Sequence, residues 1–215
     1  MLKINVIILS LFLCFIACNN SEKSKDELAA VETAEPIVTE EKDYYKPDPN
    51  TACAIPKSMR DLSSGMKKVF YQFTKNNEAN LKLFGIGNGT LGKKEVMVIV
   101  DFMQYKDNNC NNTAIRYGVG ARLFLHIKKL QSGIKVTDLA KLAAGVEYGK
   151  AAVTYSIEVI GLTGEEIRKA LPSAGDFNVE AYAKVISAVD KIQLLANDNQ
   201  NGVFISPQII PVSGS

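Results

Sequence analysis

The sequence RYGVGARLFLHIKK, residues 116–129, has the clearest alternation of apolar and polar side chains in this chain of 215 residues. Side chains of a β-strand point alternately to the two faces of a sheet. The odd positions from 117 to 127 are apolar, whereas the even positions carry Arg116, Arg122, His126 and Lys128. The pattern predicts one long strand with one face toward the core and one toward water, bent at Gly118 and Gly120.

The even positions of this strand are also the best candidate binding site. Arg116, Arg122, His126 and Lys128 would form a basic face, which Lys93, Lys94 or Lys106 of neighbouring strands could extend. Such a face suits lipid headgroups, an acidic polysaccharide or an acidic protein. The alternative is that these side chains only keep the surface soluble.

Two neighbouring segments predict further strands. Residues 95–105 are apolar at both odd and even positions, apart from Asp101, and so predict a central strand that is buried on both faces. Residues 151–160 alternate and predict a second half-buried strand. Residues 203–212 predict a closing edge strand, where Pro207 and Pro211 need no ladder hydrogen bonds.

Helical periodicity appears in four places. Residues 57–73 predict an amphipathic helix that ends near Asn76, although Val69, Tyr71 and Phe73 could instead begin a strand. Residues 136–149 predict a short helix capped by Thr137 or Asp138. A capping box at residues 163–166 predicts a helix that Pro172 ends, and residues 179–195 predict a longer one.

Strands with one wet face, followed by helices and a final strand, predict an α+β fold in which helices pack on one face of an antiparallel sheet. The alternative is a β-sandwich with peripheral helices. We expect a single domain over residues 51–215, because about 165 residues are enough for one core.

The N-terminal sequence MLKINVIILSLFLCFIAC, residues 1–18, has Lys3 followed by a short apolar run, as in a signal peptide. The ending Phe15-Ile16-Ala17-Cys18 resembles the lipobox of bacterial lipoproteins. The resemblance covers only this leader and implies a signal peptide over residues 1–17, acyl chains on Cys18, and anchoring in a bacterial cell envelope. By analogy with enteric lipoproteins, Asn19 favours the outer membrane. Acylation of Cys14, or an uncleaved anchor, is the alternative.

Residues 18–50 predict an acidic, disordered tether. Residues 19–50 hold four lysines and nine acids, whereas residues 51–215 hold twenty basic residues and fourteen acids. The tether lacks a lasting apolar period and so cannot offset its ordering entropy. No block of like charge is long enough to indicate a nucleic-acid partner.

Cys53 and Cys110 are the cysteines that remain after the leader and Cys18. In an oxidising compartment two such cysteines usually pair, so we expect a disulfide, with two free thiols as the alternative. Two cysteines and one histidine fall short of a structural zinc site. The sequence indicates neither a metal nor a cofactor.

No catalytic constellation stands out. His126 could act as a general base with Ser156 and Glu158, and Asp101, Glu147 and Glu158 could pair as carboxylates, but any domain of this composition offers such choices. The sequence therefore favours a membrane-tethered, extracytoplasmic, non-enzymatic domain for binding or assembly. The alternatives are an envelope-directed hydrolase and a membrane-inserting or toxin-related protein.

Overall fold

A computed structural model describes residues 44–47, 65–87, 90–110, 113–197 and 202–213. All of them belong to one compact unit, Pro36–Ser215. The main sheet consists of β2 (Lys67–Phe73), β3 (Val96–Cys110), β4 (Thr113–Leu130), β5 (Ala151–Ile160) and β7 (Gly175–Asp176), in that order, with β9 (Gln208–Ile210) added to β4. Every pairing in the sheet is antiparallel. The helices α1 (Leu139–Glu147), α2 (Glu165–Ala170) and α3 (Val179–Asn197) complete the predicted α+β fold.

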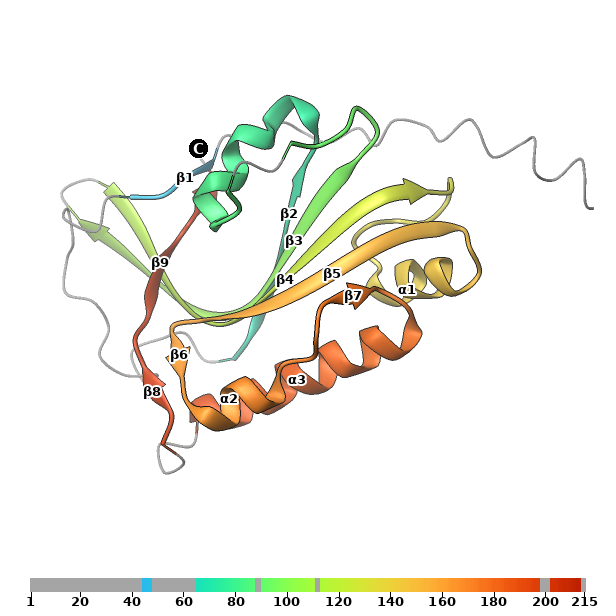
Figure 1. Cartoon of the computed structure of the whole chain (residues 1–215). Coiled ribbons are helices and arrows are strands. Elements are labelled where there is room, and N and C mark those ends of the chain that lie inside the picture. Colours follow the sequence, from blue (N-terminus) through green and yellow to red (C-terminus); the bar gives the residue numbers. More distant parts are fainter. Residues whose placement is uncertain (1–43, 48–64, 88–89, 111–112, 198–201, 214–215) are drawn as a thin grey trace, which may run out of the picture. The chain divides into compact units, whose positions relative to one another are not determined.

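The long strand β4 changes its partner at the predicted bend. One edge of β4 pairs with β3 along nearly its whole length. On the other edge, residues Gly120 to Leu130 pair with β5, whereas residues Arg116 to Gly118 pair with β9. Gly120 has φ +155°, and a Cβ atom there would lie 2.1 Å from the Phe102 carbonyl oxygen. Only glycine fits this position. The strands β3, β4 and β5 are strongly curved (Figure 1).

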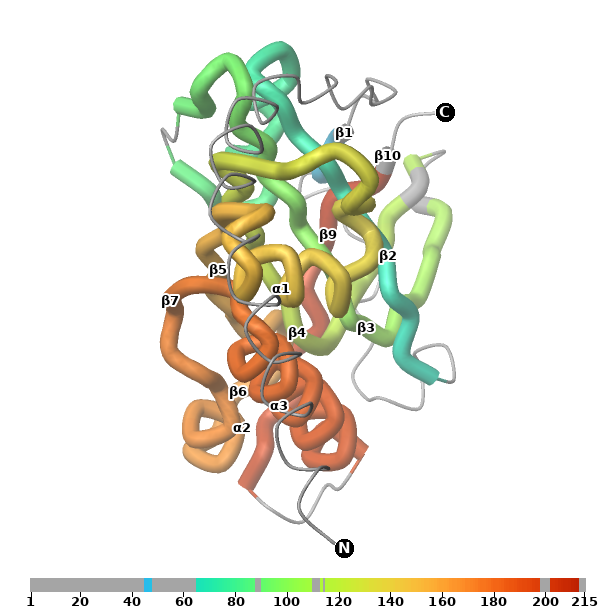
Figure 2. The backbone as a smooth tube through the Cα atoms, turned by 90° about the vertical axis from the view of Figure 1, so that its right-hand side faces the viewer, coloured from blue at the N-terminus to red at the C-terminus, as the bar shows by residue number. Residues whose placement is uncertain are grey.

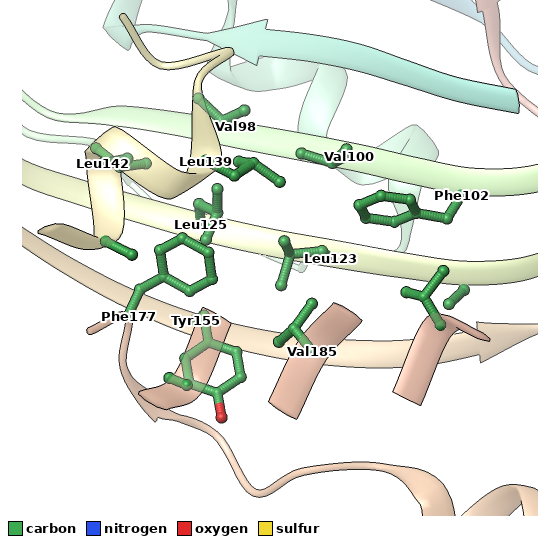
Figure 3. Packing of buried hydrophobic residues seen from close by; sticks show 14 of the residues in the cluster. Val98, Val100, Phe102, Leu123, Leu125, Leu139, Leu142, Tyr155, Phe177 and Val185 are labelled. Carbon is green, nitrogen blue, oxygen red and sulfur yellow. The ribbon is translucent and has the colours of Figure 1, made fainter. Parts of the chain in front are cut away.

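The helices cover one face of the sheet, which we call the helix face. The odd positions of β4 from Val119 to Ile127 and the even positions of β3 from Val96 to Phe102 point to this face and pack against α1 and α3. Figure 3 shows this for Leu123, Leu125 and Val98 with Leu139 and Val185. Asp138 caps α1 by accepting a hydrogen bond from the Lys141 amide at 3.1 Å. This apolar layer is the main core of the protein.

The opposite face, which we call the η4 face, is covered in part by the 3₁₀ helix η4 (Lys75–Phe84). Leu81 and Phe84 pack on Tyr71 and Phe73 of β2, and the ring centroids of Tyr71 and Phe84 are 4.7 Å apart. The predicted helix over residues 57–73 is therefore wrong for Lys67–Phe73, where the alternative strand forms. Lys67–Phe73 forms a strand because each face of β2 has a layer of residues to pack against. Residues 57–64 lie outside the part of the chain that the structure describes.

Two expectations about the second half fail locally. Thr163 does not cap α2; it lies in β6 (Leu162–Thr163), which pairs with β8 (Phe204–Ile205), and Gly164 occupies the cap without a side-chain hydrogen bond. The predicted closing strand is divided into β8, β9 and β10 (Val212–Ser213), each with a different partner. Pro207 and Pro211 lie between these pieces because proline cannot donate a ladder hydrogen bond.

The folded unit begins earlier than predicted. Tyr44–Tyr45 form β1, which pairs with β10, and Pro47 is buried. These residues fall within the range 18–50 that the sequence assigned to a disordered tether, so the start of the domain at residue 51 is wrong. Aromatic residues favour strands, and β10 offers them a partner. Residues 18–43 and 48–50 lie outside the described part.

Candidate functional site

Arg122 lies on the η4 face but is not exposed, so the structure contradicts the basic face as predicted. Its Nε and Nη2 donate to the two carboxylate oxygens of Asp101 at 2.7 and 2.8 Å, across the β3–β4 register. The side chains of Arg122 and Asp101 are 4% and 0% exposed, and the Phe84 ring of η4 lies 5.0 Å from the guanidinium carbon. The sequence pattern identified the face correctly but could not show that η4 covers this part of it.

The buried pair belongs to a larger polar network. The Tyr71 hydroxyl is hydrogen-bonded to Asp101, and burial raises the pKa of both Tyr71 and Tyr105, so both phenols stay neutral. Burial is the largest single effect and opposes the charge of Arg122, but the hydrogen bonds to Asp101 together with the negative charges of Asp101 and Glu158 outweigh it and raise the pKa of the guanidinium. One ion pair, Arg122–Asp101, with the neutral Tyr71 hydroxyl beside it therefore links β2, β3 and β4.

Arg116 is neutralised in a similar way nearer the surface. Its Nη2 donates to Asp107 at 2.9 Å, and its guanidinium carbon lies 5.2 Å from the centre of the Tyr105 ring. The hydrogen bond from Arg116 lowers the pKa of Asp107 and raises that of Arg116. Two of the four predicted basic residues therefore already have carboxylate partners within the fold.

His126 also has a carboxylate partner, with 2.9 Å between its Nε2 and Oε2 of Glu95. The same Glu95 oxygen accepts from the Gly92 amide at 3.0 Å, and these two hydrogen bonds lower the pKa of Glu95. The Glu95 amide in turn donates to the Gly92 carbonyl at 3.0 Å and closes a tight turn. His126 thus fixes a turn whose two central residues are Lys93 and Lys94.

Lys128 and Lys129 are both exposed, because β4 contains a bulge at this point. Ile127 pairs with Val153 but Lys129 pairs with Ala152, so Lys128 is the extra residue. The bulge shifts the alternation by one and leaves Lys128 and Lys129 both exposed, while the following Leu130 packs against the core. Without it, one of the two lysines would point into the helix-face core.

Four exposed lysines are therefore gathered where β3 begins and β4 ends. Lys128 is close enough to Glu95 for its charge to lower the pKa of that carboxyl, which places the bulge beside the turn. None of the four forms an ion pair with another residue that the structure describes. We call this group the lysine cluster; its members are Lys93, Lys94, Lys128 and Lys129.

The residues considered for catalysis are only partly brought together. Asp101 and Glu158 lie on either side of Arg122 in the sheet register, whereas Glu147 lies on α1 over the helix face. Burial raises the pKa of Glu158, although the charges of Arg122 and Lys46 oppose the rise. His126 has Glu95 as its hydrogen-bond partner rather than Ser156, which pairs in register with Phe124.

The lipidation site and the disulfide lie outside what the structure describes. Cys18 and Cys53 are not among the described residues, and Cys110 is the last residue of β3 with no described side chain. Among the described residues, no group of three or more His, Cys, Asp and Glu side chains could hold a metal ion. Lipidation of Cys18 and the Cys53–Cys110 disulfide stay predictions.

Comparison of the chain with protein-family models, with curated proteins and with solved structures gave no match. Within the described ranges, no helix is both long enough and apolar enough to cross a membrane.

Proposed function

We propose that the chain is a lipid-anchored protein of a bacterial cell envelope whose folded unit is a non-enzymatic binding domain for an anionic component of that envelope. The lysine cluster is the observation that supports this proposal. Arg116, Arg122 and His126 are hydrogen-bonded to carboxylates of the fold, whereas the clustered lysines are exposed and have no such partner among the residues that the structure describes. An anionic surface can compensate charges that the described part of the chain leaves unpaired.

The construction of the cluster strengthens the argument. A turn clamped by Glu95 and a bulge in a sheet strand both hold their side chains on rigid backbone. Lysines that only keep a protein soluble can be spread over its surface, whereas these four come from two separate segments and lie side by side. A preformed cluster lowers the conformational cost of binding.

The anchor is tested in cells with an acyl-chain analogue and membrane fractionation. The wild-type chain should take up the label and sediment with membranes, whereas Cys18→Ala should do neither. Labelling of Cys18→Ala would contradict the assignment of the acylated cysteine.

Binding is tested with the Cys18→Ala chain from residue 18 onward, which carries no acyl group, on isolated envelope fragments. Binding should be measurable at about 20 mM salt and lost near 0.5 M, where charges more than a few ångströms apart are screened. The cluster variant replaces four lysines by glutamine: Lys93→Gln, Lys94→Gln, Lys128→Gln and Lys129→Gln. A control with the same net charge alters four lysines elsewhere: Lys67→Gln, Lys169→Gln, Lys184→Gln and Lys191→Gln.

The cluster variant should bind at least about tenfold more weakly than the control, because four adjacent charges act on one surface. Salt-insensitive binding, no binding by the wild-type sequence, or equal losses in both variants would refute the proposal.

A further inference from the structure

The lysine cluster continues onto a third segment, the turn between α1 and β5. The Gln131 amide donates to the Lys150 carbonyl at 2.9 Å, and Leu130 pairs with Ala151, so Lys150 lies directly beside the end of β4. Tyr148 precedes it by two residues, and its side chain is 76% exposed. Figure 2 faces this end of the molecule, with α1 near the centre of the view. We call the extended surface the docking end; it consists of Lys93, Lys94, Lys128, Lys129, Lys150 and Tyr148.

The lysines of the docking end differ from those on the helices. On α2 and α3, Lys169 and Lys184 form ion pairs with glutamates one turn away, with N–O distances of 2.9 and 2.7 Å. None of the five lysines at the docking end has such a pair among the described residues. Of the acids nearby, Glu95 is held by His126 and the Gly92 amide, and Glu78 accepts from the Leu91 amide at 2.7 Å and pairs with Lys75. Glu147 ends α1 three residues before Lys150. At the docking end, five lysines from three segments thus lie close together without an ion pair to any residue that the structure describes.

We infer that the docking end binds the headgroups of anionic phospholipids. The five lysines stand on three separate segments, so a broad anionic surface can meet all of them at once, whereas one phosphate could meet only one or two. Lysine stems are long enough to reach headgroup phosphates while the backbone stays outside. Tyrosine rings favour the headgroup level of a membrane because they are apolar with one polar end.

The inference rests on the proposed function, since an acyl anchor on Cys18 would keep the domain beside a membrane. It goes further by naming the partner. Each lysine near an anionic lipid surface strengthens binding about fivefold at low salt. The anchor would hold the domain at a high effective concentration beside the membrane, so that five weak contacts could act together.

The test uses the Cys18→Ala chain from residue 18 onward, which retains the compact unit Pro36–Ser215. Its affinity is measured by co-sedimentation with vesicles of phosphatidylcholine alone and of phosphatidylcholine with an equal share of phosphatidylglycerol. The cluster variant and its charge-matched control, described above, are measured beside it, together with Tyr148→Ser. Circular dichroism during heating verifies that every variant is folded.

The chain should bind the mixed vesicles in a salt-sensitive way and should not bind phosphatidylcholine alone. The affinity of the cluster variant for the mixed vesicles should fall about 100-fold or more, whereas the affinity of the control should fall about tenfold. Tyr148→Ser should weaken binding a few-fold by the same factor at low and high salt, because its contribution is not ionic.

Three results would overturn the inference. They are the absence of binding to the mixed vesicles, equal losses in the cluster variant and the control, and tighter cluster-dependent binding to dextran sulfate than to vesicles. The last result would identify a soluble polyanion as the partner. Binding to envelope fragments without binding to vesicles would remove the lipid assignment and leave the proposed function standing, whereas loss of both would remove both.

Discussion

Arg122→Gln removes one partner of the buried pair on the η4 face and should destabilise the protein strongly. Asp101 is fully buried, and the substitution leaves its carboxylate without the two hydrogen bonds from Arg122. Breaking a buried pair in this way costs about 3–5 kcal/mol. The total stability of a domain of this size is about 10 kcal/mol, so the variant should lose roughly a third to a half of it.

The loss should depend on pH in a defined direction. Burial raises the pKa of Asp101, and the hydrogen bond and charge of Arg122 oppose that rise. Without Arg122 the pKa in the folded state rises further above the unfolded value of about 3.9. Between these two values the folded state holds the proton and the unfolded state does not, so the stability of the variant falls as pH increases. Its deficit should be at least about 1 kcal/mol smaller at pH 4.5 than at pH 7.

Urea unfolding followed by far-ultraviolet circular dichroism measures this, since the chain has no tryptophan. Arg116→Gln is the matched control, because the Arg116–Asp107 pair is 31% and 65% exposed and such pairs contribute about 1 kcal/mol or less. The double change Asp101→Leu with Arg122→Met should recover most of the loss, as apolar replacements of buried pairs often do. A cost below about 1 kcal/mol for Arg122→Gln, or a cost equal to that of Arg116→Gln, would refute the reasoning.

Two further predictions rest on the fold, and a third rests on the sequence. Gly120→Ala should cost about 2–5 kcal/mol, because its Cβ would meet the β3 backbone, whereas Gly133→Ala, with φ +88° and open space, should cost about 1–2 kcal/mol in urea unfolding. Deleting residues 22–43 should leave the melting temperature within about 2 °C, whereas a deletion that also removes β1 should lower it, since β1 pairs with β10. Peptide mapping without reduction should show Cys53 linked to Cys110; two alkylatable thiols in the native protein would contradict this.

The sheet could be predicted from the sequence because its central strands have strong and consistent periodicity. The alternation in β4 and β5, and the apolar run in β3, are properties of the segments themselves. Lys67–Phe73 is different, since its apolar residues fit both a helix and a strand. The choice there depends on whether η4 and the helices provide a layer on each side of it, which is a property of the whole fold.

The candidate site was predictable only in part for the same reason. Arg122 occupies a polar position of an alternating strand, and nothing local shows that Phe84 of η4 covers it. Lys128 and Lys129 carry a clearer signal, because two successive lysines before the core residue Leu130 break the alternation and require a bulge. The role of Glu95 in fixing the turn depends on the position of His126 across the strand pair.

The most direct test of the central claim is the acetylation rate of each lysine, measured by mass spectrometry with and without phosphatidylglycerol-containing vesicles. The proposal predicts that the vesicles slow modification of the docking-end lysines and leave the modification rates of Lys67, Lys169, Lys184 and Lys191 unchanged. Equal protection of both groups, or protection of the lysines on α2 and α3 alone, would contradict the claim that this end of the sheet is the binding surface.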